Sequence, residues 1–180
     1  LAAITDAANG VINLGTLAVD GTVALTTHGS GNATVVNDAG LNFAASTVGG
    51  VLNATATTGN MMDSGALTIT GTSSFTTSAN NATIALDTTT NAFTGAVTIT
   101  TNDNSGTDAG VTIDGGTTAL VLAASTIDGD LMLRSGHASG ITDSGTVTVG
   151  GDFAAITDAN NGVINMGTLA VDGIIALVTN

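Results

Sequence analysis

The stretch that decides the fold opens the chain and returns at its end. Residues 1–28 read LAAITDAANGVINLGTLAVDGTVALTTH, and residues 153–180 read FAAITDANNGVINMGTLAVDGIIALVTN. The second copy is offset by 152 from the first, and the two are identical at 21 of 28 positions. Identity of this extent marks a duplicated structural unit, and internal repeats indicate a repeat architecture.

A shorter repeat lies between the two copies. LNFAASTVGG begins at Leu41 and returns as LVLAASTIDG at Leu120, and the DSG that begins at Asp63 returns at Asp143. These offsets of 79 and 80 define the unit, and two units nearly make the offset of 152, with a small deletion. We therefore expect one continuous domain over residues 1–180, with units at approximately 1–27 (partial), 28–106 and 107–180 (partial).

The composition favours strands and tight turns. The chain has 34 Thr, 28 Ala, 25 Gly, 16 Asn and 14 Asp, and it lacks Pro, Cys, Trp, Tyr, Lys, Glu and Gln. Val, Ile and Thr favour strands, whereas Gly, Asn and Asp favour turns. Short alternating triplets such as Leu67-Thr68-Ile69 and Val147-Thr148-Val149 are separated by Asp-Gly and Asn-Gly turns. A unit of this length fits four coils of roughly 20 residues each.

These features predict an all-β, right-handed parallel β-helix (β-solenoid) without terminal caps. Nine stacked coils would span about 43 Å at the spacing of neighbouring strands. Disorder conflicts with an apolar content of 43% at regular spacing. An antiparallel sandwich would explain the turns but not the long period. Positions offset by 80 should lie four coils apart at one angular position, so Leu67 and Val147, and likewise Phe75 and Phe153, should share a facing.

The two ends of the sequence do not resemble caps. Capping coils of solenoids are atypical and polar, because an open end exposes core side chains and unpaired backbone groups. Leu1-Ala2-Ala3-Ile4 and Ile174-Ile175-Ala176-Leu177-Val178 are apolar instead. We expect a segment of a longer array, or one that stacks end to end with other copies.

The charge excludes several classes of partner. The net charge is −13, and Arg134 is the only Lys or Arg. Binding to nucleic acid or to an anionic membrane surface requires Lys and Arg, so neither is expected. No run approaches the roughly 20 apolar residues of a membrane helix, so membrane insertion is not expected. Without Cys there is no disulfide or thiolate metal site.

Several phrases resemble the repeats of large bacterial exoproteins of the filamentous-haemagglutinin type, which use two-partner-like secretion. They are ASTVGG at 45–50, STIDGDL at 125–131, ITDSGTVTVGG at 141–151 and NAFTGAV at 91–97. The resemblance covers nearly the whole chain and implies a right-handed parallel β-helix, export across the outer membrane, and display as long thin adhesins or fibres. The family's amino-terminal secretion domain carries Asn-Pro motifs, so this Pro-free chain would belong to the shaft.

Chemistry-bearing residues are sparse. Lyases and hydrolases built on β-helices need clustered Asp with Lys or Arg, and the sole candidate is Arg134 near Asp128 and Asp130, which we interpret as a surface ion pair. His28 and His137 are expected in exposed loops without metal-ligand spacing. We therefore expect no enzyme activity and no catalytic, cofactor-binding or metal-binding residues.

The Asp-rich turns raise the question of calcium binding, and the Thr-rich strands raise that of ice binding. Calcium is the one cofactor that Asp-rich turns could hold, but Gly115-Gly116-Thr117-Thr118 does not continue into the calcium-binding nonapeptide, and Asp-Gly turn chemistry explains the Asp more simply. Ice binding requires Thr-x-Thr on consecutive coils. Such pairs occur at Thr68, Thr98 and Thr146, but the matching phrase at 17–19 reads Leu-Ala-Val.

The function that the sequence predicts is mechanical. We expect the structural shaft of a secreted bacterial surface fibre or giant filamentous adhesin, located outside the cell or on its surface, with other copies of itself as partner. The alternative is an adhesin module whose solenoid surface binds carbohydrate or a cell-surface receptor. The four Phe lie mostly within apolar runs, and Tyr and Trp are absent, which favours the shaft.

Overall fold

The computed structural model describes residues 1–102 and 108–180, which form a parallel β-solenoid. Those residues contain 23 strands and no helix, so no helix is available to cross a membrane. Every strand pairing is parallel, and the chain makes about 8 turns with equivalent residues about 22 apart. The predicted fold is therefore confirmed. A coil is slightly longer than expected, which leaves fewer coils than the predicted nine.

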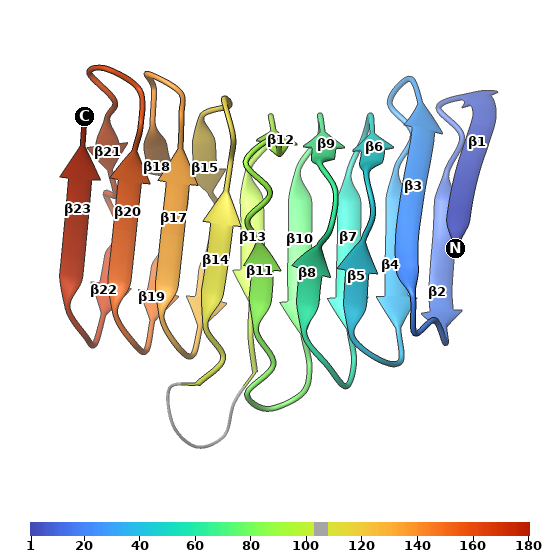
Figure 1. Ribbon diagram of the computed structural model, residues 1–180, viewed down its shortest axis with the longest axis horizontal. Coiled ribbons are helices and arrows are strands. Elements are labelled where there is room, and N and C mark those ends of the chain that lie inside the picture. Colours follow the sequence, from blue (N-terminus) through green and yellow to red (C-terminus); the bar gives the residue numbers. More distant parts are fainter. Residues whose placement is uncertain (103–107) are drawn as a thin grey trace.

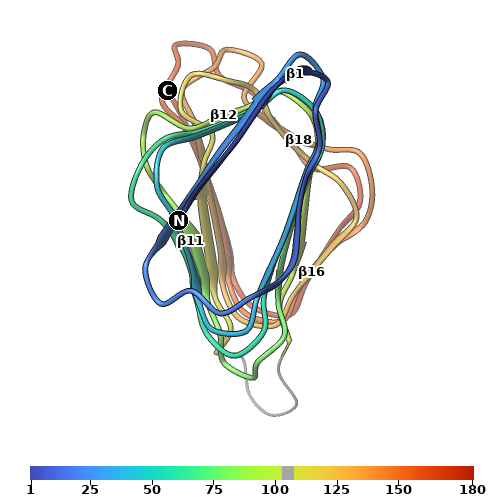
Figure 2. The same cartoon turned by 90° about the vertical axis from the view of Figure 1, so that its right-hand side faces the viewer.

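Each coil contributes to two walls, which face each other across the core (Figures 1 and 2). The first wall is the 12-stranded sheet, which consists of β1 (Ala2–Ala8), β3 (Thr22–His28), β5 (Leu41–Phe43), β6 (Ser46–Val48), β8 (Met61–Asp63), β9 (Leu67–Ile69), β11 (Ile84–Leu86), β12 (Ala92–Phe93), β14 (Val111–Asp114), β17 (Leu131–Ser135), β20 (Phe153–Thr157) and β23 (Ile175–Thr179). The second wall is the 11-stranded sheet, which consists of β2 (Ile12–Leu17), β4 (Ala33–Asn37), β7 (Leu52–Ala56), β10 (Ser73–Thr77), β13 (Val97–Thr100), β15 (Leu120–Leu122), β16 (Ser125–Ile127), β18 (Ile141–Asp143), β19 (Val147–Val149), β21 (Ile164–Asn165) and β22 (Leu169–Val171).

The coil is right-handed. In Figure 1 the strands of the first wall lie in front and run upward, the chain passes over to the fainter second wall, and it descends there while advancing from right to left. The end-on view in Figure 2 shows the two walls converging at one narrow edge. Right-handed crossovers are the rule for parallel strands, because they match the twist of the strands.

One apolar core runs along the axis between the walls. Alternate residues of each strand point inward, as in β10, where Ser73, Phe75 and Thr77 are buried and the residues between them are half-buried. All four Phe are buried, and the rings of Phe75 and Phe93 meet edge to face with centroids 5.9 Å apart. A single coil could not bury these side chains, so stacking is what stabilises each coil.

The register differs from the one that the repeat predicts. Leu67 and Val147 are both buried, as are Phe75 and Phe153, so the expected shared facing is confirmed. Their angular positions do not match, however, because Leu67 lies on the first wall and Val147 on the second. Phe75 and Phe153 are likewise on opposite walls. The expectation of four coils per repeat unit is therefore wrong.

The reason is the length of the coil. From β8 the first wall leads through β11 and β14 to β17 in three pairing steps, and another half coil brings the chain to β18 on the second wall. The strands β8, β9 and β10 thus correspond to β18, β19 and β20 after three and a half coils. Two such offsets restore the wall. From β1, the first wall leads through β3, β5, β8, β11, β14 and β17 to β20, the strand of the terminal copy, in seven steps.

A column of glycines forms the corner where the first wall of the N-terminal coils turns into the second. Gly50 N–H donates to Gly31 O at 2.9 Å, and Gly71 N–H donates to Gly50 O at 3.0 Å. A methyl group at Gly71 would lie 2.5 Å from the carbonyl carbon of Gly50 and 2.9 Å from Val51 N. The backbones of successive coils approach so closely here that only glycine fits.

The first and last strands of this sequence each pair on one side only. β1 pairs only with β3, and β23 pairs only with β20, so one edge of each strand is unpaired. Ile4 is 64% exposed on β1, and Ile174 is 71% exposed just before β23. The open ends therefore expose apolar side chains and unpaired backbone groups together.

Candidate functional site

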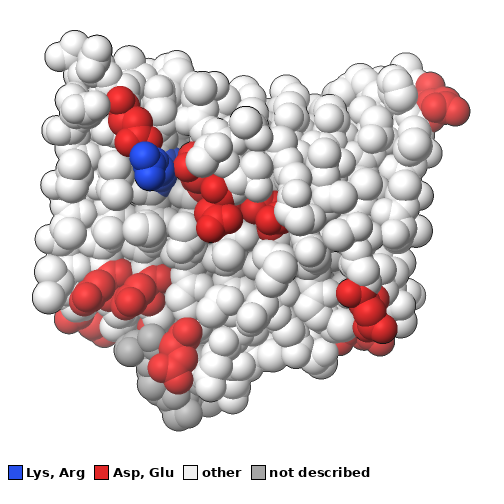
Figure 3. All heavy atoms as spheres, in the orientation of Figure 1, with Lys and Arg blue, Asp and Glu red and all other residues white. Residues whose placement is uncertain are grey.

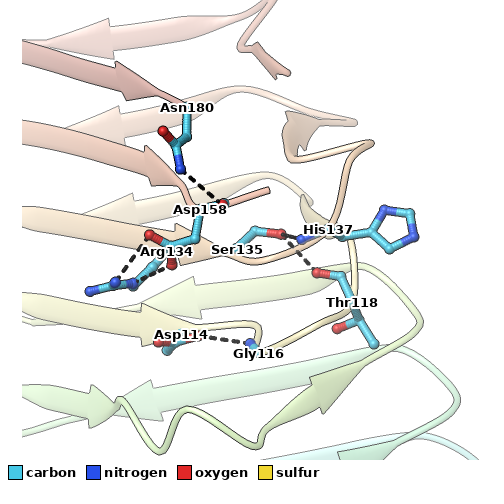
Figure 4. Close-up of polar contacts among 8 residues, drawn as sticks. All are labelled: Asp114, Gly116, Thr118, Arg134, Ser135, His137, Asp158 and Asn180. Carbon is cyan, nitrogen blue, oxygen red and sulfur yellow. Dashed lines mark hydrogen bonds and ion pairs between the residues drawn. The ribbon is translucent and has the colours of Figure 1, made fainter. Parts of the chain in front are cut away.

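The charged residues of the first wall converge around Arg134 on β17. Figure 3 shows the one basic residue of this face beside acidic ones. Arg134 Nε donates to Asp158 Oδ2 at 2.6 Å, and its Nη2 donates to Asp158 Oδ1 at 3.0 Å (Figure 4). The two side chains are 51% and 44% exposed. This bidentate pair raises the pKa of Arg134 through the hydrogen bond to Asp158 and its charge.

This arrangement corrects the ion pair suggested by the sequence. Asp128 and Asp130 lie in the turn before β17, and Arg134 pairs instead with Asp158, one coil further along. The side chain of Asp130 accepts a hydrogen bond from the backbone N–H of Asp152 at 2.8 Å. Sequence proximity misled because a coil brings residues about 22 apart side by side.

Asp114 is the buried acid of this region. It pairs in register with Arg134 on the neighbouring strand and is 7% exposed. Burial raises its pKa, opposed by the hydrogen bond that Gly116 N–H donates to Asp114 Oδ1 at 2.7 Å and by the charge of Arg134. Sequence reasoning missed this residue, since its Asp-Gly-Gly context is that of an ordinary turn.

The hollow beside these residues is small. It has a volume of about 230 Å³ and is lined by Asp87, Asp114, Met132, Arg134 and Ile156, among others. Ligand clefts usually reach about 300–1,000 Å³. Arg134 directs two of its nitrogens at Asp158, so its charge is already engaged rather than aimed into the hollow. The ion pair between Arg134 and Asp158 therefore links neighbouring coils.

Hydrogen bonds link Ser135 to the turn that follows it and to the corner of the preceding coil. Ser135 Oγ donates to Thr118 O at 2.9 Å and accepts from His137 N–H at 3.2 Å (Figure 4). His137 is exposed, as is His28, whose Nδ1 contacts Thr5 O. Both are exposed as expected, but only His137 lies in a turn, because His28 is the last residue of β3. Within residues 1–102 and 108–180 no three His or Asp side chains gather as a metal site would require.

Several Asp side chains at strand ends and in turns bond the backbone of the next coil. Asp143 Oδ1 accepts from Gly167 N–H at 2.6 Å, and its Oδ2 accepts from Thr168 N–H at 2.8 Å and Thr168 Oγ1 at 2.6 Å. The bond from the Thr168 hydroxyl is the largest cause that lowers the pKa of Asp143. Asp63, its counterpart in the preceding repeat unit, accepts from Asp87 N–H at 3.2 Å and Asn91 Nδ2 at 2.6 Å. The turn carboxylates thus fasten one coil to the next.

Comparisons with known proteins identify a repeat family. No curated protein and no solved structure matches the chain. A family model described as repeats of unknown function (DUF5649) matches twice, over residues 30–100 and 108–172. The first match contains strands β4 to β13 and the second β14 to β22. Because these matches together span well over half of the 180 residues, the chain belongs to the DUF5649 family of repeats.

Proposed function

We propose that this chain is the structural shaft of a secreted bacterial surface fibre or giant filamentous adhesin, displayed outside the cell, with no enzymatic role. The observation that carries the proposal is the apolar core, which continues through all the coils and is stabilised by contacts between neighbours. Such a body extends by adding coils without a new kind of contact. The resemblance to filamentous-haemagglutinin repeats supports the same function.

The open edges of β1 and β23 suggest the partner. An unpaired strand edge is a template for another strand, and native proteins usually protect it with charge, Pro or a covering segment. β23 (IALVT) contains no charged residue, and Leu177 is 54% exposed at the open end of the core. We therefore propose that the stack of coils continues through these edges, either as part of a longer chain or by end-to-end association of copies, in which each copy buries the terminal coil of the next.

Light scattering against protein concentration tests this association. Leu177→Lys places a charge at the open end of the core, while Met62→Lys places the same charge on the outer face of the first wall, where Met62 is 43% exposed. Measurements at about 0.15 M salt reduce the repulsion between acidic copies, since the Debye length is then about 8 Å. The native chain and Met62→Lys should grow with concentration into rods visible by electron microscopy, and Leu177→Lys should stay monomeric. A native chain that is monomeric at every concentration would overturn the end-to-end proposal.

The alternative, a solenoid surface that binds carbohydrate or a cell-surface receptor, draws on a different observation. An open hollow of about 510 Å³ lies on the first wall over Ala85, Thr112, Met132 and Ala154. Its size suits a ligand. The buried state of all four Phe weighs against carbohydrate, because sugar sites usually expose aromatic rings. A glycan array with the native chain and Met132→Lys distinguishes the two functions.

A further inference from the structure

A continuous row of threonines crosses the outer face of the second wall. Thr55 pairs with Thr76, Thr76 with Thr100, Thr100 with Thr126, and Thr126 with Thr148. These five residues, which we call the threonine row, lie on β7, β10, β13, β16 and β19. Thr100, Thr126 and Thr148 are exposed, and the other two are half-buried. The row begins after Val36 and ends before Ala170.

A second row runs beside part of the first. It consists of Thr34, Asn53, Ser74 and Thr98, which also pair in register on consecutive strands. On β7, β10 and β13 a member of each row stands on the same strand, at alternate positions and on the same face. The polar groups therefore recur at about 4.8 Å between coils and about 6.6 Å along each strand.

The outward threonines are held in place but remain available to solvent. Branching at Cβ restricts χ1, so neighbouring threonines in a sheet present their hydroxyl and methyl groups with little freedom. Inward threonines differ, because the protein itself uses their hydroxyls. Thr77 Oγ1 donates to Ala82 O at 3.0 Å, and Thr101 Oγ1 accepts from Asp128 N–H at 2.9 Å. The outer face thus offers a regular array of hydroxyls and methyls.

The chemistry of this array selects its ligand. The five strands of the threonine row contain no ionisable side chain, so the face has no charge with which to hold an ionic ligand. It also has no exposed aromatic ring, since every Phe is buried. What it does offer is a two-dimensional lattice of fixed hydrogen-bonding groups. Crystalline water repeats its hydrogen-bonding positions over distances similar to the spacing of strands.

We propose that the threonine row and its companion row form an ice-binding face. Rigid hydroxyls at lattice spacing hold a layer of ordered water, and the methyl groups between them limit competing orientations. Because the groups are already fixed, binding costs little side-chain entropy. The sequence argued against ice binding because Leu17-Ala18-Val19 lacks threonine, but that segment belongs to a coil outside the row. The row itself could not be traced in the sequence, because its members follow one another at uneven intervals along the chain.

The half-coil offset of the repeat supplies a matched control. Thr47, the counterpart of Thr126 in the preceding repeat unit, is exposed on the first wall. It pairs with Thr26 and Thr68, and the next residue in that column is Ala92. This shorter row has the same local sequence and strand type but only three threonines. A substitution at Thr47 therefore repeats the local disturbance of one at Thr126 without touching the proposed face.

The test measures ice recrystallisation and the adsorption of fluorescently labelled chain to a growing ice crystal. The native chain should slow recrystallisation and coat the crystal, Thr126→Tyr should lose both effects, and Thr47→Tyr should keep them. Tyr is compatible with a strand, and circular dichroism checks that each variant folds. If Thr126→Tyr fails to fold, Thr148→Tyr on the next coil is compared with Thr68→Tyr instead. An inactive native chain, or equal effects of the two substitutions, would overturn the proposal.

Discussion

Substitution of Gly71 by Ala should strongly destabilise the solenoid, although it adds only one methyl group. The new Cβ would lie 2.5 Å from the carbonyl carbon of Gly50 and 2.9 Å from Val51 N, and it would also contact Gly50 O. All three are backbone atoms of the adjacent coil, so no side chain can move aside. Overpacking of this kind typically costs about 1–3 kcal/mol, and the rigid corner places the expected loss at the upper end of that range.

Gly21→Ala is the matched control, because a methyl group there meets nothing within 4 Å and the backbone has no positive φ. Replacing glycine where Ala fits removes freedom from the unfolded chain and stabilises by about 0.4–1 kcal/mol. The two substitutions should therefore shift the urea midpoint, followed by circular dichroism, in opposite directions. Midpoints are compared at equal transition slopes, since repeat arrays need not unfold in one step. Equal shifts for the two variants would show that the corner is not closely packed.

The remaining predictions concern charge and the core. Burial raises the pKa of Asp114, so its ionisation opposes folding; Asp114→Asn should stabilise the chain at pH 7 and leave it unchanged at pH 3, as measured by urea titration at both values. Asp143 has a lowered pKa, so its contribution is fully present at neutral pH and declines as the pH falls through that lowered value; Asp143→Asn should destabilise more at pH 7 than at pH 3, and an equal loss at both would contradict this linkage. Arg134→Ala should change the free energy of unfolding by only about 0–1 kcal/mol, because its ion pair with Asp158 is half exposed. A larger loss in denaturant titration would show that this ion pair contributes more to stability. Phe75→Ala should cost about 3–5 kcal/mol, as it empties a fully buried site against Phe93, and a loss below about 1 kcal/mol would mean that the core closes around the gap.

The fold could be predicted from the sequence because repetition, strand triplets and turn residues all indicate the same architecture. Leu67-Thr68-Ile69 and Val147-Thr148-Val149 both form strands with the facing that alternation predicts. Their placement on opposite walls could not be predicted, because it depends on whether a unit closes a whole number of coils. Lengthening the coil slightly, to about 22 residues, turns four coils per unit into three and a half.

The ion pair of Arg134 could not be predicted from the sequence for the same reason. Its partner Asp158 lies on the next coil, and nothing in the residues between them identifies the pair. The composition did indicate that Asp and Asn belong to turns. It could not show that carboxylates such as that of Asp143 bond the backbone of the next coil. That role requires the register, which only the three-dimensional arrangement defines.

Because a repeat unit spans three and a half coils, consecutive units display the same surface residues on opposite sides of the solenoid. Each successive copy faces the opposite direction, so a rod of such copies approximates a twofold screw: identical features alternate between its two sides about every 17 Å and recur on one side after about 34 Å, given the strand spacing. In a rod built in this way, both sides carry the same surface features. Lying on any surface, it presents every second copy to that surface and every other copy to the medium, so it could bridge two surfaces through the same chemistry on each.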